Sequence, residues 1–381
     1  MVGKDLSAPT TTMATASTGR HPAARHKSTL TSPQLPESLR LEFTVSSSNV
    51  SVKDWILHQA STTKSLRHKL QVDRYSSSSS LTSRTSSHNP AAEELSFPYF
   101  RPWVVGHRGA LYDALENTRE SFQRCAALGC DAVELDVFYL PKDGSLVVFH
   151  GGGTDQTPGD LTDYCVNQDG VSILDLTYAE CQQLEFNTQF AEFACDVHHI
   201  QRAEIPTLEQ VLRDLQHTQT QVKIELKGPG TVEPTLALVE QLNMVHHCQF
   251  SSFDHHALKL LRSLRPHTDR HGHYVYRTGA LFNDPVPTDF LHQARAIGAS
   301  EVHLRYDTCT VERIQAIHAA GLQSMAWFRG PIGMQRDVTD KYWDIGNEDE
   351  TCYQAVLDTG VQQICCNRPD VLVNMLRKTM A

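Results

Sequence analysis

From Trp103 onward, short apolar runs alternate with amphipathic segments, and this rhythm constrains the fold more than any other feature of the sequence. The apolar runs include WVVG, DAVELDVF, VKIEL, EVHLRY and QQICCN, and the segments between them include TLEQVLRDL, HHALKLLRSL and VERIQAIHAAG. Runs of this kind are typical of buried strands, and the amphipathic segments have the apolar spacing of helices that cover a sheet. The alternation continues over about 280 residues, which predicts a parallel sheet and favours a closed TIM (β/α)8 barrel over an open doubly wound sheet.

Helix boundary signals support this division into elements. Asn117, Thr177 and Thr207 are each followed three residues later by Glu or Gln, the pattern of a capping box. Glycines stand where helices should end, at positions 129, 298, 321 and 360. The sequence contains no Gly-rich phosphate loop of the nucleotide-binding types, so nucleotide-binding α/β folds are disfavoured.

The first 95 residues differ in composition from the rest of the chain. They are rich in Ser, Thr and Ala and include the run YSSSSSLTSRTSSHNP. Such a segment buries too little apolar surface to offset the entropy of ordering its backbone. We therefore expect two regions: a disordered Ser/Thr-rich region at 1–95, which is a transit peptide, a linker or a phosphorylatable cytosolic tail, and a barrel domain at 100–381.

Charge, hydropathy and cysteine content disfavour several kinds of partner and cellular location. The formal net charge of −10 disfavours a nucleic-acid surface. No window has the roughly 18 consecutive apolar residues of a membrane span, and the first thirty residues lack the apolar core of a secretory signal. Ten cysteines without a zinc-type pairing of spacings favour free thiols in a reducing compartment. We expect a soluble intracellular protein, cytoplasmic or organellar, whose oligomeric state the sequence does not specify.

The joint between Val137 and Leu146 is unusually short. Roughly 8 residues are too few for a crossover helix, so the two strands form either a hairpin or a crossover without a helix. If Asp136 and His150 are to reach one site at the carboxyl ends of their strands, this reasoning requires the crossover.

Ionisable residues recur at the ends of the predicted strands. They are His107 and Arg108 after VVG, Glu134 and Asp136 in VELDV, His150 after LVVF, and Glu225 and Lys227 in IELK. In a barrel these strand ends meet at one rim. Glu134 and Asp136 are two residues apart and share a face of their strand, where they repel unless a cation lies between them. With Glu225 as a third oxygen ligand they suit a hard ion, Mg²⁺ or Ca²⁺, and Arg108 and Lys227 add positive charge for an anion.

The same residues carry a resemblance to a known family, the glycerophosphodiester phosphodiesterases. The matching motifs are GHRG at 106–109, ENT at 116–118, ELDV at 134–137, DGSLVVFH at 143–150, IPTLEQVL at 205–212, IELK at 224–227, SSF at 251–253 and NRPDVL at 367–372. The resemblance spans about 270 residues of the barrel region, and it implies the same TIM barrel fold that the rhythm of elements predicts.

The resemblance also implies roles for individual residues. A divalent cation, Mg²⁺ or Ca²⁺, is implied at Glu134, Asp136 and Glu225. The implied catalytic pair is His107 and His150, with His107 taken as the base and His150 as the acid, although the sequence does not fix that order. The implied contacts to the substrate come from Arg108, Asn117, Lys227 and Trp327. Metal and cations stabilise charge on the phosphoryl oxygens while the two imidazoles move protons.

The implied reaction is hydrolysis of glycerophosphodiesters to glycerol 3-phosphate and an alcohol, with attack either by water or first by a neighbouring hydroxyl of the substrate. The chain departs from the family pattern in the glycine run after His150 and in WFRG after the eighth predicted strand, and the stretches 187–204 and 331–351 look inserted. Substrate preference is therefore open. One alternative is a lysophospholipid or other lipid phosphodiester, and another is a catalytically silent barrel kept for binding.

Overall fold

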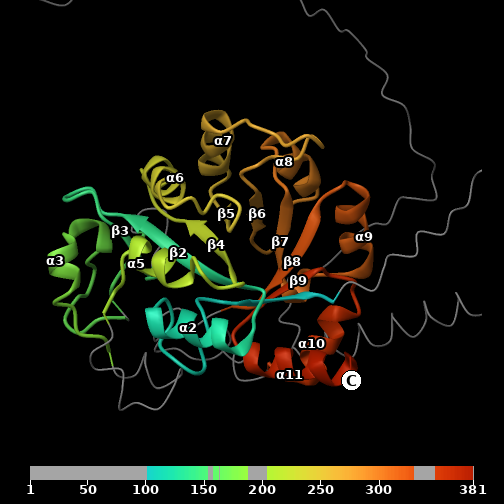
Figure 1. Cartoon of the computed structure of the whole chain (residues 1–381), viewed down its shortest axis with the longest axis horizontal. Helices are drawn as coiled ribbons and strands as arrows, with labels where there is room; N and C mark the ends of the chain where they lie inside the picture. The colour runs from blue at the N-terminus through green and yellow to red at the C-terminus, as the bar shows by residue number, and fades with distance from the viewer. Residues whose placement is uncertain (1–100, 153–157, 163, 188–203, 330–347, 381) are drawn as a thin grey trace, which may run out of the picture. The chain divides into compact units, whose positions relative to one another are not determined.

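The computed structural model describes residues 101–152, 158–162, 164–187, 204–329 and 348–380 (Figure 1). The region that we expect to be disordered, 1–95, lies outside these residues.

Eight parallel strands close into a barrel, as the sequence predicts. β1 pairs with both β2 and β9, which joins the two edges of the sheet. Figure 1 shows the strands converging on one centre with the helices outside them. The barrel strands are β1 (Trp103–Gly106), β2 (Ala132–Tyr139), β4 (Gln221–Leu226), β5 (Cys248–Ser252), β6 (Thr278–Phe282), β7 (Glu301–Arg305), β8 (Gln323–Trp327) and β9 (Gln363–Cys366). Since the strands are parallel, their carboxyl ends form one rim of the barrel.

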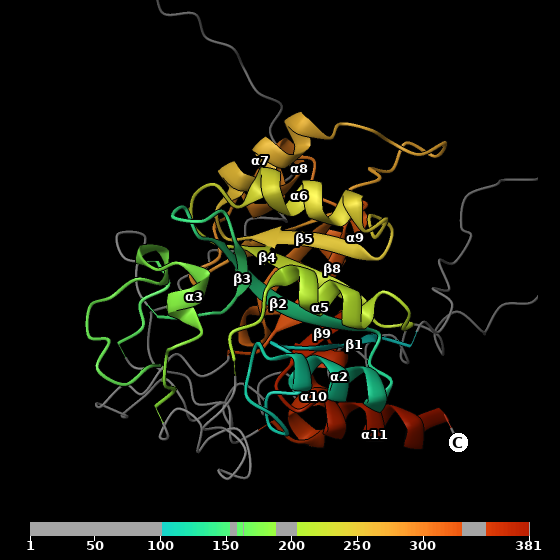
Figure 2. The ribbon, with the colours of Figure 1, turned by 60° about the vertical axis from the view of Figure 1, so that its left-hand side comes forward.

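Helices cover the outer face of the sheet (Figure 2). They are α2 (Arg119–Leu128), α5 (Leu208–Leu215), α6 (Val232–Gln241), α7 (His255–Leu264), α8 (Phe290–Ala296), α9 (Val311–Ala319), α10 (Glu350–Leu357) and α11 (Pro369–Met380). The short helix α3 (Tyr178–Cys181) lies to one side, beside β3, and its Cys181 belongs to a second apolar cluster with residues of the β2–β3 hairpin (Figure 2). The apolar layer between strands and helices is continuous, with Leu135, Ile224 and Leu212 all fully buried in it. Burial of apolar surface in this layer stabilises the barrel.

Helix boundaries agree with the sequence in most places. Thr177 and Thr207 form capping boxes with Glu180 and Gln210. The glycines at 129, 298, 321 and 360 have positive φ at or just after helix ends. The expectation for Asn117 is wrong, because the N-cap of α2 is Thr118, whose hydroxyl accepts a hydrogen bond from the backbone N–H of Ser121.

The short joint between Val137 and Leu146 is a hairpin. β3 (Leu146–Val148) pairs antiparallel with β2, with Val137 opposite Val148. His150 and Asp136 therefore reach the same rim without the crossover that the sequence led us to expect. β2 continues past the barrel to Tyr139, and β3 returns along it until the N–H of Phe149 donates to the carbonyl oxygen of Asp136 at 3.0 Å. An antiparallel return thus brings His150 back to the rim.

The interior of the barrel contains a buried polar network. Lys223, on β4, donates hydrogen bonds to Gln249 and, at 2.8 Å, to Glu301 Oε2, which also lies 2.9 Å from His303 Nε2. The side chains of Lys223 and Glu301 are each 1% exposed. Burial lowers the pKa of Lys223 against the opposing effect of Glu301. A buried charge of this kind needs its partner, because an unpaired charge in the interior is costly.

The described cysteines are free and buried, which agrees with the expectation of unpaired thiols. Within the described ranges, no helix is both long enough and apolar enough to cross a membrane.

Candidate active site

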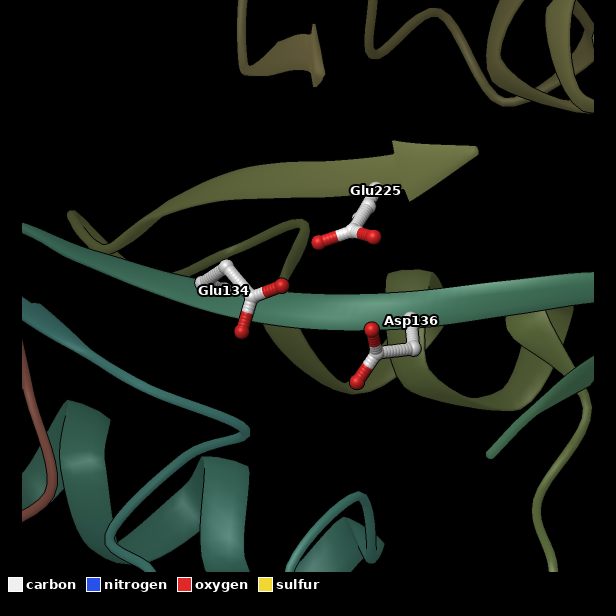
Figure 3. Close-up of side chains that lie close together, drawn as sticks. All are labelled: Glu134, Asp136 and Glu225. Atoms are coloured by element: carbon white, nitrogen blue, oxygen red, sulfur yellow. The ribbon is translucent and has the colours of Figure 1, made fainter. Parts of the chain in front are cut away.

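Three carboxylates meet at the rim of the barrel. Glu134 and Asp136 come from β2, and Glu225 comes from the adjacent strand β4, where it is the register partner of Asp136. Figure 3 shows the three side chains turned toward one another from the two strands. One oxygen from each lies within 4.8 Å of the others. The sequence predicted this acidic trio, and the structure brings its members together.

Burial and mutual repulsion make it unfavourable for all three carboxylates to be ionised at once. Burial, Asp136 and Glu225 raise the pKa of Glu134 well above its ordinary value. Burial and Asp136 also raise the pKa of Glu225 to about 7, although Lys227 opposes this effect. Burial disfavours ionisation of Asp136 as well, but Lys227, His150 and Arg108 together hold its pKa below the usual range. Buried carboxylates that repel one another gain the most from a cation between them.

The donor set fits a hard divalent cation. All three ligands are carboxylate oxygens, which Mg²⁺ and Ca²⁺ prefer, and the described residues offer no histidine or cysteine in the same group. Glu225 is also partly open to solvent, with 13% of its side chain exposed, so water can complete a coordination shell there.

His107 follows β1 and faces the trio. Its Nε2 lies 3.9 Å from Glu134 Oε2, and its Nδ1 lies 2.8 Å from Asn367 Oδ1. Burial and the nearby charge of Arg108 lower the pKa of His107 to about 3, although Asn367 and Asp136 oppose the shift. Burial thus favours the neutral imidazole, which is the form that can accept a proton.

His150 reaches the same rim from the hairpin that ends in β3. Its Nδ1 lies 3.3 Å from Tyr164 Oη. Burial and the charges of Arg108 and Lys227 lower the pKa of His150, while Asp136 raises it. Because the N–H of the preceding residue, Phe149, binds the carbonyl oxygen of Asp136, His150 lies beside the trio, and both histidines reach the same rim.

Arg108 is held by carboxylates of the chain itself. Its Nη1 donates to Glu116 Oε1 and Oε2 at 3.0 and 2.9 Å, and its Nε lies 3.6 Å from Asp136 Oδ2. Its backbone N–H donates to Glu134 Oε2 at 3.0 Å. Only 4% of the Arg108 side chain is exposed. In this arrangement, Arg108 orients two members of the trio and contributes positive charge beneath the site.

Asn117 and Lys227 both bind Asp136. The Asn117 Nδ2 donates to Asp136 Oδ2 at 2.9 Å, and its Oδ1 accepts from the Asp136 N–H at 3.3 Å. The Lys227 ammonium lies 3.3 Å from Asp136 Oδ1 and 3.7 Å from Glu225 Oε1. Asn117 is thus a support for a trio carboxylate, whereas Lys227 is 20% exposed and borders the open side of the site.

Trp327 ends β8 at the rim. Its ring packs edge to face against Phe253, with 5.7 Å between the ring centroids. Phe253 follows β5 and is 37% exposed. The two aromatic rings give the site an apolar border.

Gly109, the last residue of the GHRG motif, is required by close packing. Its φ is +91°, and a Cβ there would lie 2.3 Å from Ser121 Oγ and 2.8 Å from the backbone carbon of Ser121 in α2. Gly109→Ala is expected to lower the free energy of unfolding by about 2–4 kcal/mol, since it combines a left-handed backbone with overpacking. Urea denaturation measures the change. Gly170→Ala is the control, because Gly170 also has positive φ but no atom within 4 Å of the added Cβ. Equal losses in the two variants would contradict the packing argument.

Sequence reasoning assigned no role to three residues at this site. Glu116 lies inside the ENT motif, and its carboxylate accepts two hydrogen bonds from Arg108. Asn367 directly follows β9, so the rule of polar residues at strand ends could have found it. Tyr164 carries no sequence signal, since its contact with His150 depends on a loop. Of the two stretches that look inserted, residues 188–203 and 331–347 lie outside the described residues, whereas 348–351, which include Glu348, are described.

Comparison with known proteins identifies the family. The model of the glycerophosphoryl diester phosphodiesterase family matches residues 107–370. A curated glycerophosphodiester phosphodiesterase of Caldanaerobacter subterraneus is 27% identical over 281 residues, which cover 72% of this chain and 98% of that protein. A lysophospholipase D of Rattus norvegicus is 28% identical over 144 residues, which cover 37% of this chain and 42% of that protein.

The barrel is also similar to solved structures of phosphodiesterases. A putative glycerophosphodiester phosphodiesterase of Galdieria sulphuraria is 27% identical with a TM-score of 0.57, covering 73% of this chain and 98% of that one. A phosphodiesterase of Oleispira antarctica, solved with the product sn-glycerol-3-phosphate, is 20% identical with a TM-score of 0.54, covering 72% of this chain and 97% of that one. The barrel, the motifs and the family match together show that the chain is a phosphodiesterase that belongs to the glycerophosphoryl diester phosphodiesterase family.

Proposed function

We propose that this phosphodiesterase hydrolyses glycerophosphodiesters, such as deacylated phospholipids, to glycerol 3-phosphate and an alcohol. The observation that carries the proposal is the meeting of two imidazoles with three carboxylates at one rim of the barrel. The family match and the product bound to the Oleispira antarctica relative support the substrate class. We assign the chemistry to a single domain, 100–381, because every residue with a proposed role lies within it.

In this proposal, Glu134, Asp136 and Glu225 hold Mg²⁺ or Ca²⁺. Such an ion, when bound, supplies Lewis-acid stabilisation of the charge on the phosphoryl oxygens. Asn117 and Lys227 keep the Asp136 carboxylate in place, and Arg108 does the same for Glu134 through its backbone N–H. Lys227 also contributes positive charge toward the phosphate from the open side of the site.

The two histidines move the protons. His107 accepts the proton of the attacking hydroxyl, which belongs either to water or to the neighbouring hydroxyl of the substrate, as a P–O bond forms. His150 donates a proton to the oxygen of the departing alcohol as the second P–O bond breaks. The negative charge of the bound phosphate favours the protonated form of His150. When water attacks, the step gives glycerol 3-phosphate directly, and each imidazole regains its starting state by exchange with the solvent. When the substrate hydroxyl attacks, the step gives a cyclic phosphate, and water must then open it, with the protons moving in the opposite direction, to give glycerol 3-phosphate.

An assay on glycerophosphocholine tests this function. We expect release of glycerol 3-phosphate and choline, loss of turnover after dialysis against a chelator, and recovery on addition of Mg²⁺ or Ca²⁺. Absence of metal-dependent turnover on glycerophosphocholine, glycerophosphoethanolamine and glycerophosphoinositol by a folded protein would refute the proposal.

A lysophospholipid is the second candidate substrate. The exposed ring of Phe253 beside Trp327 offers an apolar border that an acyl chain could contact, and the Rattus norvegicus relative is named a lysophospholipase D. Lysophosphatidylcholine and glycerophosphocholine should therefore be compared at equal concentration. A higher kcat/KM for the acylated substrate would favour this second function.

A further inference from the structure

Asn367 connects the candidate base to a buried carboxylate. It follows β9, and its Oδ1 lies 2.8 Å from His107 Nδ1. The backbone N–H of His107 also donates to the carbonyl oxygen of Cys366 at 3.0 Å, so the two strand ends are joined beside the ring. Asn367 is fully buried, and it lies 260 positions from His107 in the chain.

The orientation of the Asn367 amide follows from its other partners. Its Nδ2 lies 2.9 Å from the carbonyl oxygen of Arg329 and also contacts Glu348 Oε1. A backbone carbonyl only accepts hydrogen bonds, and so does a carboxylate. The NH₂ group must therefore face Arg329 and Glu348, which leaves Oδ1 toward His107.

Glu348 is itself held in place. Its Oε2 accepts hydrogen bonds from the backbone N–H of Asn367 at 2.9 Å and from Tyr353 Oη at 2.7 Å. Glu348 is 5% exposed. Three donors thus surround one buried carboxylate, and its position is fixed by the end of β9 and by α10.

This arrangement determines the tautomer of His107. Because Asn367 Oδ1 can only accept, His107 Nδ1 must carry the hydrogen, and the neutral ring then has its lone pair on Nε2. Nε2 is the nitrogen that lies 3.9 Å from Glu134 Oε2 and faces the acidic trio. The lone pair therefore points to the place where a base is needed.

We propose that Asn367 and Glu348 are positioning residues that hold His107 as the Nδ1–H tautomer with Nε2 free to accept a proton. The inference rests on the proposed function for its catalytic consequence, but the tautomer itself is a property of the free protein. It also gives His107 the role of base, which the sequence leaves open.

Glu348→Gln is a near-isosteric test. In the variant, the amide oxygen replaces Oε2 as acceptor for the Asn367 N–H and Tyr353, and the new NH₂ faces Asn367 Nδ2. Two facing donors remove one of the two contacts that orient the Asn367 NH₂, while the Arg329 carbonyl still accepts from it. The amide is then held less firmly, and the Nε2–H tautomer of His107 becomes partly populated. We expect kcat to fall about 10–100-fold, as for other partners that orient functional histidines, with little change in KM.

Asn367→Leu removes the acceptor altogether and should lower kcat in the same way. Glu240→Gln is the matched control, because Glu240 likewise accepts a hydrogen bond from a tyrosine, Tyr276 Oη at 2.7 Å, but lies on α6 away from the site. We expect its kcat and KM to equal those of the parent protein.

The tautomer is read directly from long-range ¹⁵N–¹H correlation spectra of the full chain labelled at histidine, with the His107 signal assigned from its loss in His107→Gln. We expect Nδ1–H in the parent protein and a shift toward Nε2–H in Glu348→Gln. An Nε2–H ring in the parent protein would overturn the inference, and so would an unchanged kcat in a folded Asn367→Leu variant. If the parent protein lacks turnover on any phosphodiester, the proposed function fails, and the spectra still decide whether Asn367 sets the tautomer.

Discussion

His107→Ala is expected to lower kcat by about 10²–10⁴-fold, because it removes the proposed base. Burial favours the neutral ring, its Nε2 lies 3.9 Å from Glu134 Oε2, and its Nδ1 lies 2.8 Å from Asn367 Oδ1. Since the protein binds the phosphate mainly through other groups, KM should change much less than kcat. Steady-state kinetics on glycerophosphocholine measure both constants.

His256→Ala is the control for this experiment. His256 is exposed on α7, so its removal should leave activity and stability unchanged. Full activity in His107→Ala would contradict the assignment of the base and would revive the reading of the barrel as catalytically silent.

Lys223→Met is expected to lower the free energy of unfolding by about 3–5 kcal/mol, the usual cost of breaking a buried ion pair by removing one partner. Methionine fills much of the same volume, but it leaves the Glu301 carboxylate buried beside His303 without its cation. Urea denaturation measures the loss.

Two further variants separate charge from packing. Lys223→Met combined with Glu301→Gln should lose less stability than Lys223→Met alone, because the unpaired charge is gone. Lys378→Met removes the exposed partner of Glu350 and should cost less than about 1 kcal/mol. A Lys223→Met protein as stable as its parent would contradict the presence of a buried ion pair between Lys223 and Glu301.

Much of the fold follows from local sequence signals. The alternation of strands and helices predicts the barrel, since parallel strands with short links close in few ways. Thr177 and Thr207 cap helices as expected, because a capping box depends only on residues near in sequence. The same local pattern gives the wrong answer for Asn117, because its side chain binds Asp136, 19 residues away on β2. Thr118 is the N-cap of α2 instead.

The sequence predicts those residues of the candidate site that lie at the carboxyl ends of barrel strands. Residues at the carboxyl ends of parallel strands meet at one rim, which correctly brings together Glu134, Asp136 and Glu225. The rule failed for the hairpin before His150, since it did not allow β2 to extend beyond the barrel and β3 to return along it. Glu348 could not be found in this way, because it lies in a loop and acts through a contact with Asn367.

The most direct test of the account is a crystal structure with Ca²⁺ and glycerol 3-phosphate bound. We expect one ion with oxygens of Glu134, Asp136 and Glu225 about 2.3–2.6 Å away, and a phosphate oxygen on the same ion. We also expect His107 Nε2 and His150 on opposite sides of the phosphorus. An ion bound elsewhere, or a phosphate that contacts neither histidine, would contradict the central claim that these five side chains form one catalytic centre.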